Sequence, residues 1–188
     1  MHAIDLTPAT STQFVRRYDS RRGAMALATI LCLASAGCGS DGPIAPGIGS
    51  GSVTATGAVS ASGSGLAVFQ SISSGGTSLF QLVIAPLTQT AGTWQLQIAS
   101  YSGRPAAGTY ALAPLSATPT TPTANFYYNS AGAIQLFNAT TGQLVITSSS
   151  STEVRGTFTF TATDAGGNNS ITAHGSFQAQ CAPGTPCQ

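Results

Sequence analysis

The chain has 188 residues, of which only 6% are charged, and it contains no Lys. Four of its six Arg precede Cys38, so the segment after that cysteine carries two Arg and three acidic residues, a formal charge of −1. A surface so poor in charge offers no basic footprint for a phosphate backbone and no acidic cluster for a cation. We therefore expect no nucleic acid partner, no metal and no cofactor.

Residues 23–37 form an uncharged apolar run that ends in small residues and follows a cationic stretch, residues 16–22. A positive flank, a short apolar region and a small-residue exit are typical of a secretory signal peptide. The run is shorter than the roughly 20 apolar residues that a bilayer crossing needs. We expect residues 1–37 to be a cleaved signal peptide; the alternative is a plain signal anchor or a secreted protein in which Cys38 is incidental.

A cysteine directly after Ala36 and Gly37 resembles the cleavage site of bacterial lipoprotein precursors, although Ser35 stands where that family usually has Leu. The resemblance implies cleavage after residues 35–37, a diacylglycerol on the thiol of Cys38 and acylation of the new amino terminus. Gly39 stands where an Asp would favour the inner membrane. The resemblance thus implies an exported protein, held by lipid in the cell envelope and, more narrowly, in the outer membrane.

Residues 38–52 are rich in Gly, Ser and Pro, which predicts a flexible tether before a domain spanning residues 53–188. From Val53 onward, short stretches alternate apolar and polar residues between clusters of Gly, Ser, Asn and Pro. The stretches are 53–61, 66–72, 78–85, 93–99, 108–112, 125–129, 133–137, 143–147, 155–163 and 171–177. This period predicts an all-β fold, an antiparallel β-sandwich or partly open β-barrel of about eight to ten strands.

Two hairpins are specific enough to predict a register, because a one-residue slip would turn an apolar set toward water. The first is expected to set three apolar pairs on the core face: Ile84–Trp94, Leu82–Leu96 and Phe80–Ile98. The second is expected to set bulky residues against small ones: Ala162–Ile171, Phe160–Ala173, Phe158–Gly175 and Gly156–Phe177. The turn between its strands is predicted over residues 164–169.

The last hairpin also resembles the closing hairpin of uncharacterised bacterial lipoproteins, with G-T-F-T-F at residues 156–160 and G-S-F at residues 175–177. That resemblance implies a fold and a location but no activity. Between the strands, residues 113–123 contain Pro114, Pro119 and Pro122, which cannot donate to a ladder. We expect this segment to be a long connection or an edge.

His174 is the one histidine after Cys38, and the alternation places it on a polar strand face. A single His cannot build a zinc site alone, and no G-x-S-x-G motif accompanies it. A triad of Ser, His174 and Asp164 or Glu153 would depend on geometry, so we predict no catalytic residues. Asp164 starts a Gly- and Asn-rich segment that we interpret as a hairpin turn rather than a calcium loop.

Cys181 and Cys187 flank a segment with Pro and Gly that favours a tight turn. Because an exported chain meets an oxidising compartment, we expect them to form a disulfide; free thiols are the alternative. Trp94, Tyr101 and Tyr127 are candidates for a ligand-stacking platform, if their rings are exposed and contiguous. The other interpretation of these aromatics is packing in the core and along the strands.

The function that these features favour is that of a non-enzymatic envelope lipoprotein with a structural or interaction role. Its partners would be membrane lipid, through acylated Cys38, and an unidentified protein or glycan. The second hypothesis is a carbohydrate- or peptide-binding β-sandwich module, and the third is a hydrolase. An exposed aromatic patch would favour the second, and a carboxylate within hydrogen-bond reach of His174 would favour the third.

Overall fold

The computed structural model describes residues 48–88, 90–114 and 121–187, so the predicted signal peptide and Cys38 lie outside the described residues. The prediction of an all-β fold is confirmed. Within the described residues there are nine strands: β1 (Gly49–Gly57), β2 (Ala61–Ser74), β3 (Thr77–Ala85), β4 (Trp94–Ser100), β5 (Gly108–Leu112), β6 (Thr123–Ser130), β7 (Ala133–Ser149), β8 (Glu153–Thr163) and β9 (Ser170–Cys181).

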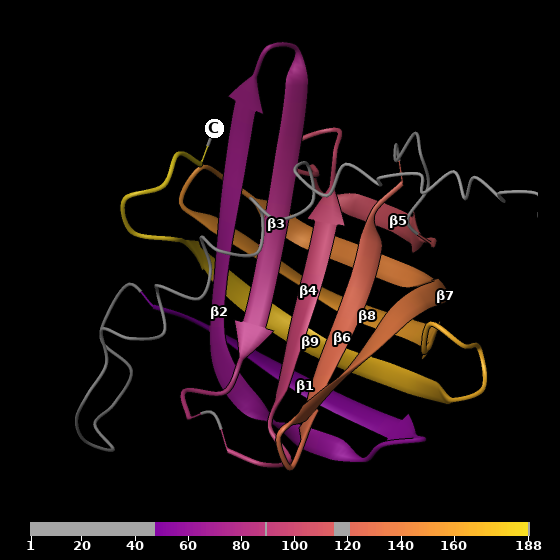
Figure 1. Ribbon diagram of the computed structural model, residues 1–188. Coiled ribbons are helices and arrows are strands. Elements are labelled where there is room, and N and C mark those ends of the chain that lie inside the picture. The colour runs from indigo at the N-terminus through magenta and orange to yellow at the C-terminus, as the bar shows by residue number, and fades with distance from the viewer. Residues whose placement is uncertain (1–47, 89, 115–120, 188) are drawn as a thin grey trace, which may run out of the picture. The chain divides into compact units, whose positions relative to one another are not determined.

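Eight of the strands described here close into an antiparallel barrel, and β5 is the additional strand. The order around the barrel is β7, β6, β4, β3, β2, β1, β9 and β8, and β8 pairs again with β7. In Figure 1, β2, β3, β4 and β6 run side by side across β8 and β9, which lie behind them. Closure pairs the edges that an open sheet would leave free, so the fold is a barrel and not a sandwich, and the barrel is closed where a partly open one was expected.

The long strand β7 joins two stretches that the sequence predicts as separate strands. Its ladder with β8 shifts register between Ala139 and Thr141 and again between Ile146 and Ser148. Such irregularities bend a strand and increase its twist. The first half of β7 can therefore pair with β6, and the second half with β5.

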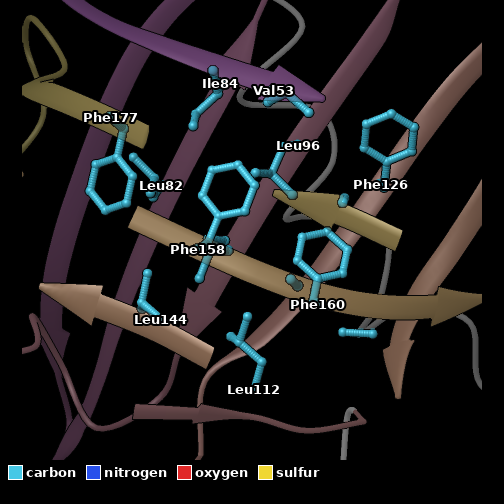
Figure 2. Close-up of a cluster of buried hydrophobic side chains, with 14 of the residues drawn as sticks. Val53, Leu82, Ile84, Leu96, Leu112, Phe126, Leu144, Phe158, Phe160 and Phe177 are labelled. Atoms are coloured by element: carbon cyan, nitrogen blue, oxygen red, sulfur yellow. The ribbon is translucent and has the colours of Figure 1, made fainter. Parts of the chain in front are cut away.

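Side chains fill the barrel. Figure 2 shows Leu82, Leu96 and Phe126 from one wall facing Phe158 and Phe160 from the other. All five are buried, with at most 3% of their surface exposed. An eight-stranded barrel is just wide enough for its own side chains to fill. The interior is thus a packed core, and functional groups have to be sought on the outer faces, at the barrel ends and in the loops.

The predicted register of the closing hairpin is confirmed at every pair. Phe158 lies opposite Gly175, and Gly156 lies opposite Phe177. A Cβ atom built on Gly175 would lie 2.6 Å from Cζ of Phe158, and one built on Gly156 would lie 2.9 Å from Cζ of Phe177. Each phenylalanine ring therefore lies directly over the glycine of the neighbouring strand, as the small-against-large pattern predicts.

The tether prediction is wrong at its end, because β1 begins at Gly49 and includes residues 49–52. In this strand glycine permits close approach. A Cβ atom on Gly51 would lie 2.8 Å from Cγ2 of Ile84, and one on Gly49 would lie 2.6 Å from the backbone nitrogen of Gln180. The glycines that suggested a flexible linker are needed here because the neighbouring strands lie too close to leave room for a side chain.

The predicted register of β3 with β4 is wrong by two residues. Leu82 pairs with Ile98, and Ile84 pairs with Leu96, while Trp94 pairs with Tyr128 of β6. A two-residue shift keeps the same side chains on the core face, so apolar alternation cannot distinguish the two registers. The turn before β4 decides: the amide of Gly92 donates to the carbonyl of Asn129 at 2.7 Å, which aligns β4 with β6.

The proline-rich segment lies outside the strands where it is described. β5 ends at Leu112 and β6 begins at Thr123, so Pro114 and Pro122 belong to the connection, as predicted. Pro119 lies outside the described residues. The amide of Ala113 donates to the carbonyl of Pro122 at 3.2 Å and ties the two ends of the connection together.

The hairpin geometry predicts a sharp contrast between two substitutions on adjacent strands. Phe158→Ala removes a buried ring and should lower the free energy of unfolding by about 3–5 kcal/mol. His174→Ala changes an exposed side chain and should leave that free energy within about 0.5 kcal/mol of the wild type. Urea denaturation of both variants measures the difference; equal losses would contradict the assignment of the inner and outer faces.

Candidate functional site

The outer wall of β8 and β9 is polar, as the alternation predicts. His174 is exposed on this wall, and its neighbours across the ladders are Thr159 of β8 and Thr54 of β1. Within the part of the chain that the structure describes, no hydrogen bond or ion pair joins His174 to a carboxylate. Hydroxyl groups therefore surround the imidazole, and the arrangement provides no charged partner for general base catalysis.

Glu153 lies at the edge of the same wall and is engaged by three side chains. Its Oε2 accepts hydrogen bonds from Nε2 of Gln178 at 2.7 Å, from Nε2 of Gln180 at 2.9 Å and from Nη2 of Arg155 at 3.1 Å. These bonds, that of Arg155 first, hold the pKa of the carboxyl below its usual value. Because Arg155 is half exposed, the ion pair contributes little to stability and organises the surface instead.

Asp164 forms the turn that was predicted between β8 and β9. Its Oδ1 accepts from the backbone of Asn168 at 3.0 Å, and its Oδ2 accepts from the side chain of Asn169 at 2.6 Å. The Asn169 side chain is the main reason why the pKa of Asp164 lies below its usual value. Both carboxylate oxygens are used within the turn, which favours the hairpin interpretation over a calcium loop.

The three predicted stacking aromatics do not form one exposed platform, which corrects that expectation. Trp94 faces the barrel interior and is only 5% exposed, whereas Tyr101 is 42% exposed. Tyr127 points to the outer face, where it is half-buried and its hydroxyl donates to Oε1 of Gln97 at 3.3 Å. Burial raises the pKa of this tyrosine. The separation follows from strand alternation, which sends Trp94 inward and Tyr127 outward.

The predicted disulfide between Cys181 and Cys187 is present, and the two Cα atoms are 6.0 Å apart. The loop that it closes lies against β2. The amide of Ala182 donates to the carbonyl of Phe69 at 2.8 Å, and the amide of Ser71 donates to the carbonyl of Pro186 at 3.1 Å. The ladder between β1 and β2 ends where Gly49 pairs with Ala67. The bridge therefore holds the C-terminal segment against the part of β2 that β1 does not reach.

The sequence did not single out Arg104, which lines a cavity of about 240 Å³ between the end of β4 and the start of β5. Ser100, Ser102, Pro105 and Tyr110 also line it, together with Ala106 and Pro122. The hydroxyls of Ser100 and Ser102 are 2.9 Å apart, and the hydroxyl of Tyr110 donates to the carbonyl of Ala106 at 2.9 Å. Both contacts lie among the residues that line the cavity.

Over the described residues, no three His, Cys, Asp or Glu side chains gather closely enough to hold a metal ion. Nor does that region contain a helix that is long and apolar enough to cross a membrane. The candidate sites are therefore the polar outer wall, the disulfide loop and the cavity beside Arg104.

The disulfide loop predicts a modest and local effect of removing the bridge. The double variant Cys181→Ser, Cys187→Ser should lose about 2 kcal/mol of stability, since the bridge closes only a short loop. Amide exchange should accelerate at Ser71 and Ala182, whose hydrogen bonds hold the loop, and remain slow at Phe158 in the core. Unchanged exchange at Ser71 and Ala182 would contradict the role assigned to the bridge.

No family model matches this sequence, and no curated protein or solved structure matches it either. The function of the chain must therefore be inferred from its own residues and their geometry.

Proposed function

We propose that this chain is a non-enzymatic lipoprotein of the cell envelope, anchored through acylated Cys38, with a structural or interaction role. The observation that carries the proposal is the Cys181–Cys187 disulfide, considered together with the signal-like N-terminus. Structural disulfides persist in oxidising compartments and are rare where thiols are kept reduced. A bridged chain in which a positive flank, an apolar run and a small-residue exit precede Cys38 fits export.

The position of Cys38 also supports the proposal. β1 begins at Gly49, so only a short segment rich in Gly and Pro separates the cysteine from the barrel. A lipid on Cys38 would hold the barrel close to the membrane surface. A single acyl chain gives only marginal anchoring, whereas the diacylglycerol on Cys38 would supply two chains and an acylated amino terminus a third.

The absence of an enzymatic role is part of the proposal and is supported by the geometry of the described residues. The barrel interior is packed, His174 lies among hydroxyls, and Glu153 and Asp164 are held by other partners. General acid–base chemistry needs titratable groups within reach of one another and of a substrate. None of these groups is placed to act on another.

An exposed apolar group favours an interaction role over a purely structural one. Ile134 and Leu136 of β7 are 74% and 39% exposed, and both point to the outer face. Leu136 pairs with Tyr127 of β6, so the three side chains are neighbours on one surface. Contiguous apolar groups on a soluble domain mark contact surfaces more often than isolated ones do.

Substitution of Cys38 tests the anchoring. Expressed in a Gram-negative host, the wild-type chain should be cleaved before Cys38, and its mature amino terminus should carry the mass of the added lipids. Cys38→Ser should accumulate as the uncleaved precursor, because the lipid-accepting thiol is missing. Cys32→Ala is the matched control, since Cys32 lies inside the apolar run and should be processed normally. Normal cleavage and full solubility of Cys38→Ser would overturn the lipoprotein proposal; mass spectrometry of the purified chains decides.

A further inference from the structure

The disulfide loop lies along the part of the β2 edge that β1 does not reach. There β9 forms a short parallel ladder with β2, which ends with Cys181 opposite Phe69. Further along the same edge, Cys187 forms a parallel bridge with Ser71. Two pieces of chain, one on each side of the loop, therefore take the place of a neighbouring strand.

The disulfide makes these two pieces continuous along the edge. Their partners Phe69 and Ser71 are alternate residues of β2, and alternate residues of a strand lie roughly 6.6 Å apart. The Cα atoms of Cys181 and Cys187 are 6.0 Å apart. Cys187 thus lies close to the place that the second residue after Cys181 would take in an uninterrupted strand. Without the bridge, only the backbone of residues 182–186 joins the two pieces.

The residues between the two cysteines end the sheet and offer no new edge to it. Pro183 and Pro186 have no amide hydrogen to donate to a further strand. The carbonyl of Ala182 accepts from the amide of Thr185 at 3.1 Å and from its hydroxyl at 2.7 Å, so the loop turns on itself. Prolines and covering loops are means by which native proteins prevent a sheet edge from pairing with another chain.

The strand beneath this loop has no such protection of its own. Residues 66–72, L-A-V-F-Q-S-I, are mostly apolar and contain no proline. No charged residue occurs in β2 or in its neighbour β3, and the chain has no Lys, the residue that often protects exposed edges. An uncharged segment of this kind pairs with other strands when its edge is free. A second copy of the chain offers an identical edge, and two identical edges can pair about a two-fold axis.

We propose that the disulfide loop covers a strand-pairing edge of β2, and that without the Cys181–Cys187 bridge two copies of the chain pair through this edge. Pairing uses the uncovered edge of both copies, so association through it stops at a dimer. The inference goes beyond the proposed function and does not depend on it, because it concerns only residues of β2 and residues 181–187.

Light scattering after gel filtration tests the pairing. The full-length protein is purified in its bridged form, any other thiol is blocked with iodoacetamide, and half of the sample is treated with dithiothreitol. One thiolate of this dithiol attacks a sulfur of the bridge, and the second thiol resolves the mixed disulfide. The protons of the reagent end on two cysteine thiols as it closes to a cyclic disulfide. At rising concentration, the molar mass of the reduced sample should approach twice that of the bridged sample.

Amide exchange in the same two samples identifies the pairing edge. In dilute reduced protein, Ser71 and Ala182 should both exchange faster than in the bridged protein, because the hydrogen bonds between loop and edge are lost. At high concentration the partner strand should protect Ser71 again, whereas Ala182 should continue to exchange fast in the displaced loop. Slow exchange at Phe158 in both samples shows that the barrel stays folded.

Two matched lysine substitutions distinguish edge pairing from other association. In the reduced protein, Ile72→Lys adds a charge to the uncovered strand of both copies and should abolish the dimer. Ile72 is partly exposed, so a lysine at this position can reach water. Ile134→Lys makes the same change at an exposed position of β7, away from this edge, and should leave the dimer intact.

Four results would overturn the proposal. One is a reduced sample whose molar mass equals that of the bridged sample at every concentration. Another is growth beyond a dimer, which the pairing of two identical edges does not give. The third is a dimer that Ile72→Lys leaves intact or that Ile134→Lys disrupts. The fourth is fast exchange at Phe158 after reduction, which would assign the bridge to the stability of the whole barrel.

Discussion

Two glycine–phenylalanine contacts set how closely β8 and β9 can pack with the rest of the barrel. Phe158 covers Gly175, and Phe177 covers Gly156, at distances that leave no room for a Cβ atom. A Cβ on Gly175 would also collide with the carbonyl of Ser52 in β1, so the same glycine permits β1 to approach. Because the rings fill the space that the glycines leave, the barrel closes with a packed interior.

A packed interior and a charge-poor surface leave few places for function. Most of the charges described are already satisfied: Glu153 by Arg155 and two glutamines, and Asp164 by its own turn. The loop after β4 is different, because Arg104 lines a cavity there and no salt bridge joins it to a carboxylate among the described residues. In a small barrel the ends and loops are where a binding group can be placed without disturbing the core.

Sequence predicted the closing hairpin correctly because that register sets every ring opposite a Gly or Ala of the neighbouring strand, whereas a two-residue shift would set a ring against Ile171 or Phe177. It predicted the faces of β3 and β4 but missed their register by two, since Leu82 faces the core in either alignment and the contact of Gly92 with β6 is not local. The sequence placed Gly51 in a flexible linker, because a glycine-rich composition is the same for a flexible segment and for a strand that packs closely against its neighbours. Arg104 was missed because a cavity that forms only when the chain folds cannot be read from a sequence.

The most direct test of this account is the proton NMR spectrum of the glycines in the closing hairpin. An α proton that lies beneath a phenylalanine ring is shielded and moves upfield. The account predicts upfield α-proton resonances for Gly156 and Gly175, which return to ordinary strand values in Phe177→Leu and Phe158→Leu respectively. Gly132, whose surroundings are open, provides the unshifted reference. Ordinary values for Gly156 and Gly175 in the wild type would contradict the ring-over-glycine packing on which the closed barrel depends.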